Sequence, residues 1–182
     1  MPNYRRLYMP GGTYSFTVAT GGRSPIFREP DAVLTLARSM RQIRAKHSFT
    51  TVAMIVLPDH LHCIWALPRE DSDFSTRWRR IKSVFTTAWV AHVNLSPARS
   101  ESQASRGERG VWQRRFWEHL IRDENDMERH FDYIHFNAVK HGYVHHPSEW
   151  PWSTFARHVR LGAYPPEWGT VEPPAPDFRP FE

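Results

Sequence analysis

The chain has 182 residues, 40% of them hydrophobic, which is enough to fold around one core and excludes wholesale disorder. A formal charge of +5 and a sequence pI near 9.7 favour a polyanionic partner without identifying one. Trp, Tyr and Phe make up 14% of the residues and suit stacking on unpaired bases as well as filling a core.

Two further features bear on the compartment. Cys63 is the one cysteine of the chain, so an internal disulfide is excluded and a reducing compartment fits. The N-terminus lacks the apolar core of a signal peptide, and no apolar run approaches the length that spans a bilayer. We therefore expect a cytoplasmic protein with no membrane segment.

The chain begins with a strand pattern followed by a helix pattern. Residues Thr13–Thr20 alternate and place Tyr14, Phe16 and Val18 on one face, as a half-buried strand requires. Apolar residues then recur at helical spacing from Val33 to Ile43. This spacing predicts an amphipathic helix whose outer side is basic.

The middle of the chain predicts a strand pair and a second helix. Thr50–Leu57 and His60–Leu67 are apolar, and a Pro-Asp turn signal separates them. They form either an antiparallel hairpin or a bent strand pair. From Asp71–Ser75 onward, apolar residues return at helical spacing, with basic residues on the opposite side. Residues 94–110 are rich in Ser, Arg, Glu and Gly and predict a mobile surface loop.

The last third predicts one more strand and one more helix. Val111–Arg122 resumes strand character, and a helix runs from about Asn125 to His141 before Gly142, a residue type favoured where helices end. The Pro- and Trp-rich stretch from about 147 to 182 predicts an irregular cover. The order of elements indicates a single domain over 1–182, an α+β, ferredoxin-like sandwich with a mainly antiparallel sheet and helices on one face.

His60 and His62 form the first candidate site. Side chains alternate along a strand, so both imidazoles point to one face while Leu61 and Cys63 point to the other. Two imidazoles on one face can chelate a divalent metal. The alternative is a pair of half-exposed histidines near a turn, and the H-x-H pattern by itself favours that alternative.

The helix from Asn125 to His141 carries the second candidate site. His130, Tyr133, Asn137 and Lys140 recur on one side of it, next to an apolar stripe. Tyr133 and Asn137 lie one turn apart, so a phenol and an amide oxygen could both reach one metal site. The alternative is an amphipathic helix with a half-buried tyrosine, which these residues alone favour.

Six segments that follow one another in the chain are YRRLYMPGGTYSFTV, LPDHLHCIW, RWRRIK, FWEHLIR, DYIHFNAVKHGYV and WPWSTF. In this order they resemble the REP-associated tyrosine transposases, a family of HUH single-strand nucleases. The resemblance spans most of the chain, and several independent motifs in one order are hard to attribute to chance.

The resemblance implies a role for each matching residue. His60 and His62 match the metal-binding histidine pair, Tyr133 matches the nucleophile, and Asn137 matches the polar residue that completes the metal site. The family resemblance also implies cleavage of single-stranded DNA beside a REP hairpin that carries a short GTAG-type guide sequence. The implied products are a 5′-phosphotyrosine and a free 3′-hydroxyl.

The chemistry of these residues fits the implied reaction. A bound metal neutralises the oxygens of a phosphodiester, which otherwise repel a nucleophile. A phenol has an ordinary pKa of about 10, so a tyrosine nucleophile needs help to lose its proton. Two imidazoles and an amide oxygen suit Mg²⁺ or Mn²⁺, and the imidazoles favour Mn²⁺.

Several further residues have two interpretations each. Glu118 and His119 either support the metal site or are structural, and Asp59 either orients His60 or only forms the turn. Basic and aromatic residues either contact DNA or form solvated surface. The residues expected to contact DNA are Tyr4, Arg5, Arg6, Arg77, Arg79, Arg80, Lys82, His130 and Lys140.

Three functions compete at this point. They are a transposase-type nickase and strand transferase, a non-catalytic binder of structured single-stranded DNA or RNA, and a metal phosphodiesterase that uses water. The combination of His60, His62 and Tyr133 favours the first, because a binder would not need all three residues and a water-using enzyme needs the histidines but not the tyrosine. We expect a monomer that supplies its own tyrosine, with a dimer as the alternative.

Overall fold

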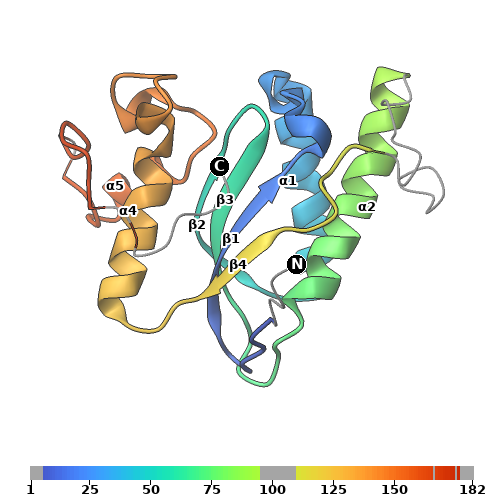
Figure 1. Cartoon of the computed structure of the whole chain (residues 1–182), viewed down its shortest axis with the longest axis horizontal. Coiled ribbons are helices and arrows are strands. Elements are labelled where there is room, and N and C mark those ends of the chain that lie inside the picture. Colours follow the sequence, from blue (N-terminus) through green and yellow to red (C-terminus); the bar gives the residue numbers. More distant parts are fainter. Residues whose placement is uncertain (1–5, 95–109, 166, 175, 177–182) are drawn as a thin grey trace.

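The computed structural model describes residues 6–94, 110–165, 167–174 and 176. Its centre is a four-stranded sheet in the order β2-β3-β1-β4, in which all neighbours are antiparallel (Figure 1). The strands are β1 (Thr13–Ala19), β2 (Thr50–Val56), β3 (His60–Ala66) and β4 (Trp117–Leu120). With α1 (Pro30–Arg44) and α2 (Phe74–Val93), they follow the β-α-β-β-α-β order of a ferredoxin-like fold, as predicted.

Helices α1 and α2 pack side by side on one face of this sheet (Figure 1). The core between them is largely aromatic, with Phe16 of β1 lying against Trp65 of β3 and Trp78 of α2. Trp65 and Trp78 stack with ring centroids 4.2 Å apart. Offset aromatic packing of this kind adds to the free energy of burial and holds α2 in register on the sheet.

A further helix, α4 (Glu124–Lys140), lies on the opposite face of the sheet (Figure 1). Its Ile134 and Ala138 join a second core with Ile55 of β2 and Ile64 of β3. The α+β class and antiparallel sheet are confirmed, but the expectation that the helices share one face is wrong for α4. Because β2 and β3 also carry apolar side chains on this second face (Ala53, Ile55 and Ile64), it needs a cover too.

The ends of α4 differ slightly from the prediction. The helix begins at Glu124 instead of about Asn125, and the side chain of its N-cap residue Asp123 accepts a hydrogen bond from the backbone N–H of Asp126. At the other end Gly142 has φ +69°, the left-handed conformation expected where a helix stops.

The strand predicted for Val111–Arg122 is shorter than expected. Only four residues of it form β4, and Trp112 makes an isolated bridge to Thr20. The loop predicted near 94–110 lies, apart from its two ends, outside the described residues. Between β1 and α1 the chain forms two short 3-10 turns, η1 (Gly21–Arg23) and η2 (Ile26–Arg28).

The described residues beyond Pro147 contact β2 and α4. They include η3 (Pro147–Glu149) and a short helix, α5 (Phe155–Arg160). The backbone N–H of Val56 donates to the carbonyl of Trp152, and that of Thr154 donates to Met54. These bonds occupy backbone groups at the outer edge of β2, which would otherwise be an unpaired sheet edge.

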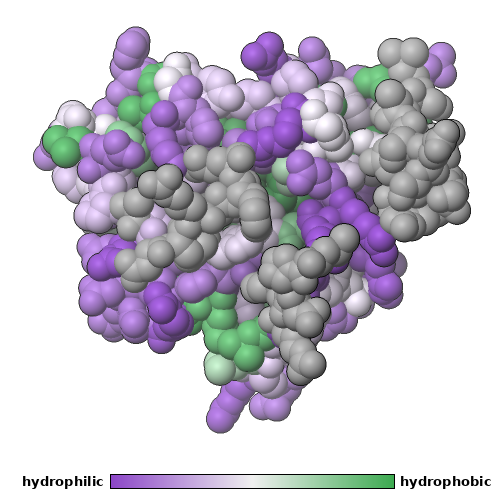
Figure 2. Space-filling view, viewed as in Figure 1, coloured by the Kyte–Doolittle hydropathy of each residue, from purple (hydrophilic) through white to green (hydrophobic). Residues whose placement is uncertain are grey.

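No helix of the described part of the chain is long and apolar enough to cross a membrane. Figure 2 shows that hydrophilic residues dominate the visible described surface, with a small apolar area near the lower edge of the view.

Arg77 of α2 is one place where the structure corrects the sequence interpretation. Its guanidinium, expected to contact DNA, is 3% exposed and donates to both carboxylate oxygens of Asp71, at 2.6 and 3.1 Å. It also donates to the carbonyl of Ser48 at 2.8 Å. Arg77 therefore ties the start of α2 to the loop before β2 and is not available to DNA.

We expect Arg77→Ala to lower the free energy of unfolding by about 2–4 kcal/mol, because it leaves a carboxylate and a carbonyl without their buried donor. Urea denaturation would measure this. The matched control is Arg80→Ala on the same helix, where the side chain is exposed and the expected change is within about 0.5 kcal/mol. Equal effects of the two substitutions would contradict a structural role for Arg77.

Candidate functional site

The two histidines of β3 face α4, while Leu61 between them enters the core on the α1–α2 side. The rings of His60 and His62 have centroids 4.9 Å apart and are almost perpendicular, at 89°. Both side chains are buried, with exposed fractions of 1% and 2%. Strand alternation thus produces the paired imidazoles expected from the sequence.

One nitrogen of each imidazole is held by a neighbouring side chain. His60 Nδ1 donates to Asp59 Oδ1 at 2.6 Å, and Asp59 also pairs with Arg23 at 3.0 Å. His62 Nδ1 lies 2.8 Å from the hydroxyl oxygen of Thr17 on β1. Asp59 therefore contacts His60 as well as forming the turn. Second partners of this kind fix the ring orientation of metal-ligating histidines.

The Nε2 atoms of His60 and His62 are buried and have no hydrogen-bond partner among the described residues. Burial lowers the pKa of His60, although the hydrogen bond to Asp59 opposes this. Burial lowers the pKa of His62 well below its ordinary value, and the neighbouring His60 and His141 add to the effect. Both rings are therefore neutral near pH 7, the state in which imidazole binds a metal.

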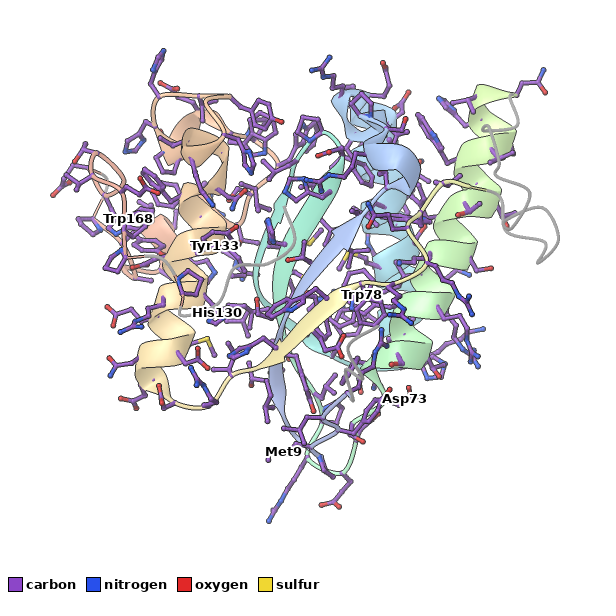
Figure 3. All side chains as sticks on the ribbon, in the orientation of Figure 1. Met9, Asp73, Trp78, His130, Tyr133 and Trp168 are labelled. Atoms are coloured by element: carbon purple, nitrogen blue, oxygen red, sulfur yellow. The ribbon has the colours of Figure 1, made fainter. Side chains whose placement is uncertain are left out.

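Helix α4 brings Tyr133 and Asn137 to these histidines. The Tyr133 ring lies edge-on to His62, with centroids 5.4 Å apart, and it is 7% exposed. Figure 3 shows Tyr133 and His130 following one another along α4. Lys140 Nζ lies 4.8 Å from the centroid of the Tyr133 ring. A cation therefore sits beside the phenol that the family resemblance implies is the nucleophile.

Asn137 is fully buried, and neither atom of its amide has a hydrogen-bond partner among the described residues. It lies four residues after Tyr133, which contacts His62, and four before His141, whose ring centroid is 5.5 Å from that of His60. Residues four apart share a helix face, so Asn137 faces the histidine pair.

Buried polar atoms without partners cost about 1–3 kcal/mol each, so several at one place point to a ligand-binding site. Here the atoms are two imidazole Nε2 atoms and one amide oxygen, a donor set that fits a divalent cation. These donor atoms therefore suit the divalent metal that we expect from the sequence.

A second group of possible metal ligands lies nearer the start of α4. The ligand atoms of His119, Asp126 and His130 lie within 4.8 Å of one another. Asp126 Oδ2, however, already accepts bonds from His119 Nε2 at 2.7 Å and from Arg122 Nε at 3.0 Å. His130 Nδ1 donates to the backbone carbonyl of Asp126, at 2.7 Å. The positive charge of Arg122 beside the Asp126 carboxylate repels a metal ion at this place. We therefore interpret His119, Asp126 and His130 as a structural link between β4 and α4.

The structure separates Glu118 from the histidine pair. In the register of β1 and β4, Glu118 lies opposite Phe16, so it faces the α1–α2 side of the sheet. Its carboxylate is 3.3 Å from the guanidinium of Arg6. The interpretation of Glu118 as support for the metal site is therefore wrong, because neighbouring strand residues face opposite sides. His119 does face α4, where it binds Asp126.

The remaining residues expected to contact DNA lie in different places. Arg79 and Arg80 are exposed on α2, and Lys82 donates to the carbonyl of Gln113 at 2.9 Å. Arg6 donates to the hydroxyl of Ser75 and lies over the ring of Phe116. Arg79, Lys82 and Phe116 line one cavity of about 540 Å³ together with Trp112. Tyr4 and Arg5 lie outside the described residues.

His141 is the residue of this site that sequence reasoning missed. We assigned it only to the end of a helix, where a cation suits the helix dipole. The signal was nevertheless present, because Tyr133, Asn137 and His141 recur every four residues on one face of α4.

The fold and the geometry of this site define a class: a ferredoxin-like domain in which a helix places a tyrosine beside an H-x-H pair. No family model matches the chain. The chain is 42% identical over 168 residues to a REP-associated tyrosine transposase of Escherichia coli, covering 92% of this chain and 91% of that protein. It is 38% identical over 169 residues to a Haemophilus influenzae protein of the same family name, covering 93% and 94%.

A solved structure of a REP-associated tyrosine transposase bound to a REP hairpin is similar over 98% of this chain and 99% of that one. The TM-score is 0.77 and the sequence identity 38%. The chain belongs to the REP-associated tyrosine transposases, which are HUH-type endonucleases.

The buried carboxylate of Asp126 makes stability depend on pH. Burial alone would raise the pKa of Asp126, but hydrogen bonds from Arg122 and His119 outweigh burial and hold it well below its ordinary range. A lowered folded-state pKa contributes stability that is present above the unfolded value of about 3.9 and is lost as the pH falls toward the folded value.

We therefore expect Asp126→Asn to lower the free energy of unfolding by about 1–3 kcal/mol near pH 7, since the variant loses a charged acceptor of three hydrogen bonds. The difference from wild type should shrink as the pH falls below about 4. Denaturant unfolding across this range measures it. Glu124→Gln, at an exposed position in the same turn, is the control. A difference that does not change with pH would contradict the assignment.

Proposed function

We propose that this chain nicks single-stranded DNA beside REP hairpins and joins strands through a covalent bond to Tyr133. The observation that carries the proposal is the packing of Tyr133 against His62, at the place where partnerless Nε2 and amide atoms gather. The solved relative bound to a REP hairpin supports the choice of substrate.

We propose that His60 Nε2, His62 Nε2 and the Asn137 amide oxygen hold the divalent metal, Mg²⁺ or Mn²⁺. When bound, such a cation supplies neutralisation of phosphodiester charge and polarisation of the phosphorus. Asp59 and Thr17 orient the two imidazoles, and their burial keeps both rings unprotonated.

In the proposed nicking step, the phenol oxygen of Tyr133 attacks the phosphorus. An O–P bond to tyrosine forms as the phenol releases its proton to solvent. The bond from phosphorus to the 3′ oxygen breaks, and that oxygen takes a proton from solvent and leaves as a free 3′-hydroxyl. The Lys140 ammonium, 4.8 Å from the ring centroid, stabilises the negative charge that develops on the phenol. A 3′-hydroxyl that later attacks the phosphotyrosine reverses the step and joins strands.

Exposed basic residues are proposed to hold the DNA backbone. Arg79 and Arg80 are the candidates on α2, and Arg6 and Lys82 lie beside the aromatic rings of Phe116 and Trp112. In this proposal a GTAG-type guide sequence at the hairpin foot is read by Tyr4, Arg5 and Arg6.

The contact between Tyr133 and His62 within one chain supports a site whose two halves come from the same chain. We therefore propose a monomer that uses its tyrosine in cis and acts on DNA in the cytoplasm. Size-exclusion chromatography with light scattering would distinguish a monomer from a dimer.

Tyr133→Phe should abolish the protein–DNA adduct, because it removes the oxygen that forms the covalent bond. A single-stranded REP palindrome labelled on both flanks, incubated with protein and Mn²⁺, would show the adduct on a denaturing gel. Hairpin binding should be retained, which controls for folding. Cleavage that persists in Tyr133→Phe would instead identify water as the nucleophile.

Substitution of the two groups of possible metal ligands should have different effects. We expect His60→Ala to weaken Mn²⁺ binding by at least tenfold, since it removes a proposed ligand. His119→Ala should change the same affinity by less than about threefold, because its Nε2 is bonded to Asp126. Titration calorimetry of the metal-free protein measures both. If His119→Ala weakened Mn²⁺ binding more than His60→Ala, the metal would be assigned to His119, Asp126 and His130 instead.

A further inference from the structure

His141 ends α4 beside the proposed metal ligands. Its ring centroid is 5.5 Å from that of His60, and the two rings meet at 75°. It lies one helical turn after Asn137, on the helix face that also carries Tyr133. His141 is thus a third histidine beside His60 and His62, and the proposed nicking step does not use it.

The backbone and a neighbouring ring hold His141 in this position. Its backbone N–H donates to the carbonyl of Asn137 at 3.0 Å, which continues the helical pattern of α4. Gly142, with φ +69°, then turns the chain away. The ring also stacks with Tyr143, with centroids 5.8 Å apart. The imidazole therefore contacts both Tyr143 and His60.

The spacing of the rings matches that of imidazoles that share one cation. With a metal–nitrogen bond of about 2.1 Å, each ring centroid lies about 3.2 Å from the metal. Two such ligands at angles of about 90–120° at the metal then have centroids about 4.5–5.5 Å apart. The separations here are 4.9 Å for His60 and His62 and 5.5 Å for His60 and His141.

We propose that His141 is a further metal ligand, so that the site offers three imidazoles and one amide. This inference rests on the proposed function, in which His60, His62 and Asn137 hold the metal. A third nitrogen ligand makes the site prefer Mn²⁺, Co²⁺ or Zn²⁺ over Mg²⁺, because imidazole binds transition metals better than it binds Mg²⁺.

The test measures metal binding by the full-length, metal-free protein without DNA. Mn²⁺ affinity comes from the electron paramagnetic resonance signal of the free ion, and Mg²⁺ affinity from competition with Mn²⁺. We expect His141→Ala and His141→Asn to weaken Mn²⁺ binding about tenfold or more while changing Mg²⁺ binding by less than about threefold.

A second readout reports the ligands themselves. Co²⁺ bound to the wild-type protein has visible absorption bands that depend on the number and type of its ligands, and both His141 variants should shift these bands. The matched control is His145→Asn, because His145 is exposed on the same segment. It should leave the metal affinities and the Co²⁺ spectrum unchanged. Thermal melting of the metal-free variants controls for folding.

His60→Ala distinguishes the role proposed for His141 from the metal site of His60, His62 and Asn137 on which it rests. If Mn²⁺ binding is lost in His60→Ala but stays within twofold of wild type in both His141 variants, with an unchanged Co²⁺ spectrum, only the role of His141 is wrong. If the His141 variants bind DNA more weakly but bind metal as wild type does, His141 contacts phosphate and is not a metal ligand. If His60→Ala leaves Mn²⁺ binding unchanged, both proposals are overturned.

Discussion

The packing of α4 on the second face of the sheet is the interaction on which the rest of the site depends. Ile134 and Ala138 of α4 bury apolar surface against Ile55 and Ile64, and this contact sets the rotation of the helix about its axis. Because side chains three and four residues apart share a face, that rotation places Tyr133, Asn137 and His141 over the histidines of β3.

The stability of this arrangement has to offset the cost of the polar groups inside it. Two imidazole nitrogens and a whole amide are buried without partners among the described residues. Native proteins keep such orphan groups where a ligand or a reaction uses them. The network of His119, Asp126 and Arg122 links β4 to the first turn of α4 and helps to hold the helix that carries these groups.

The two faces of the sheet carry different kinds of residues. The face under α1 and α2 forms an aromatic core, and polar contacts beside it, such as the pair of Arg77 and Asp71, are structural. The face under α4 carries His60 and His62, and the helix brings Tyr133 and Asn137 to them. The similarity to the REP-associated tyrosine transposases covers nearly the whole chain, so it includes the elements on both faces of the sheet.

The sequence by itself determined the strands and helices, the H-x-H pair and the four-residue spacing along α4, because these are local patterns of period two and 3.6. It could not determine which face α4 covers, since β2 and β3 are apolar on both sides. Nor could it separate Arg77 from the exposed arginines beside it, or assign Glu118 to the side of the sheet away from His62. Only the tertiary structure decided these points, because they depend on strand register and on partners distant in the chain, such as Ser48 for Arg77 and His60 for His141.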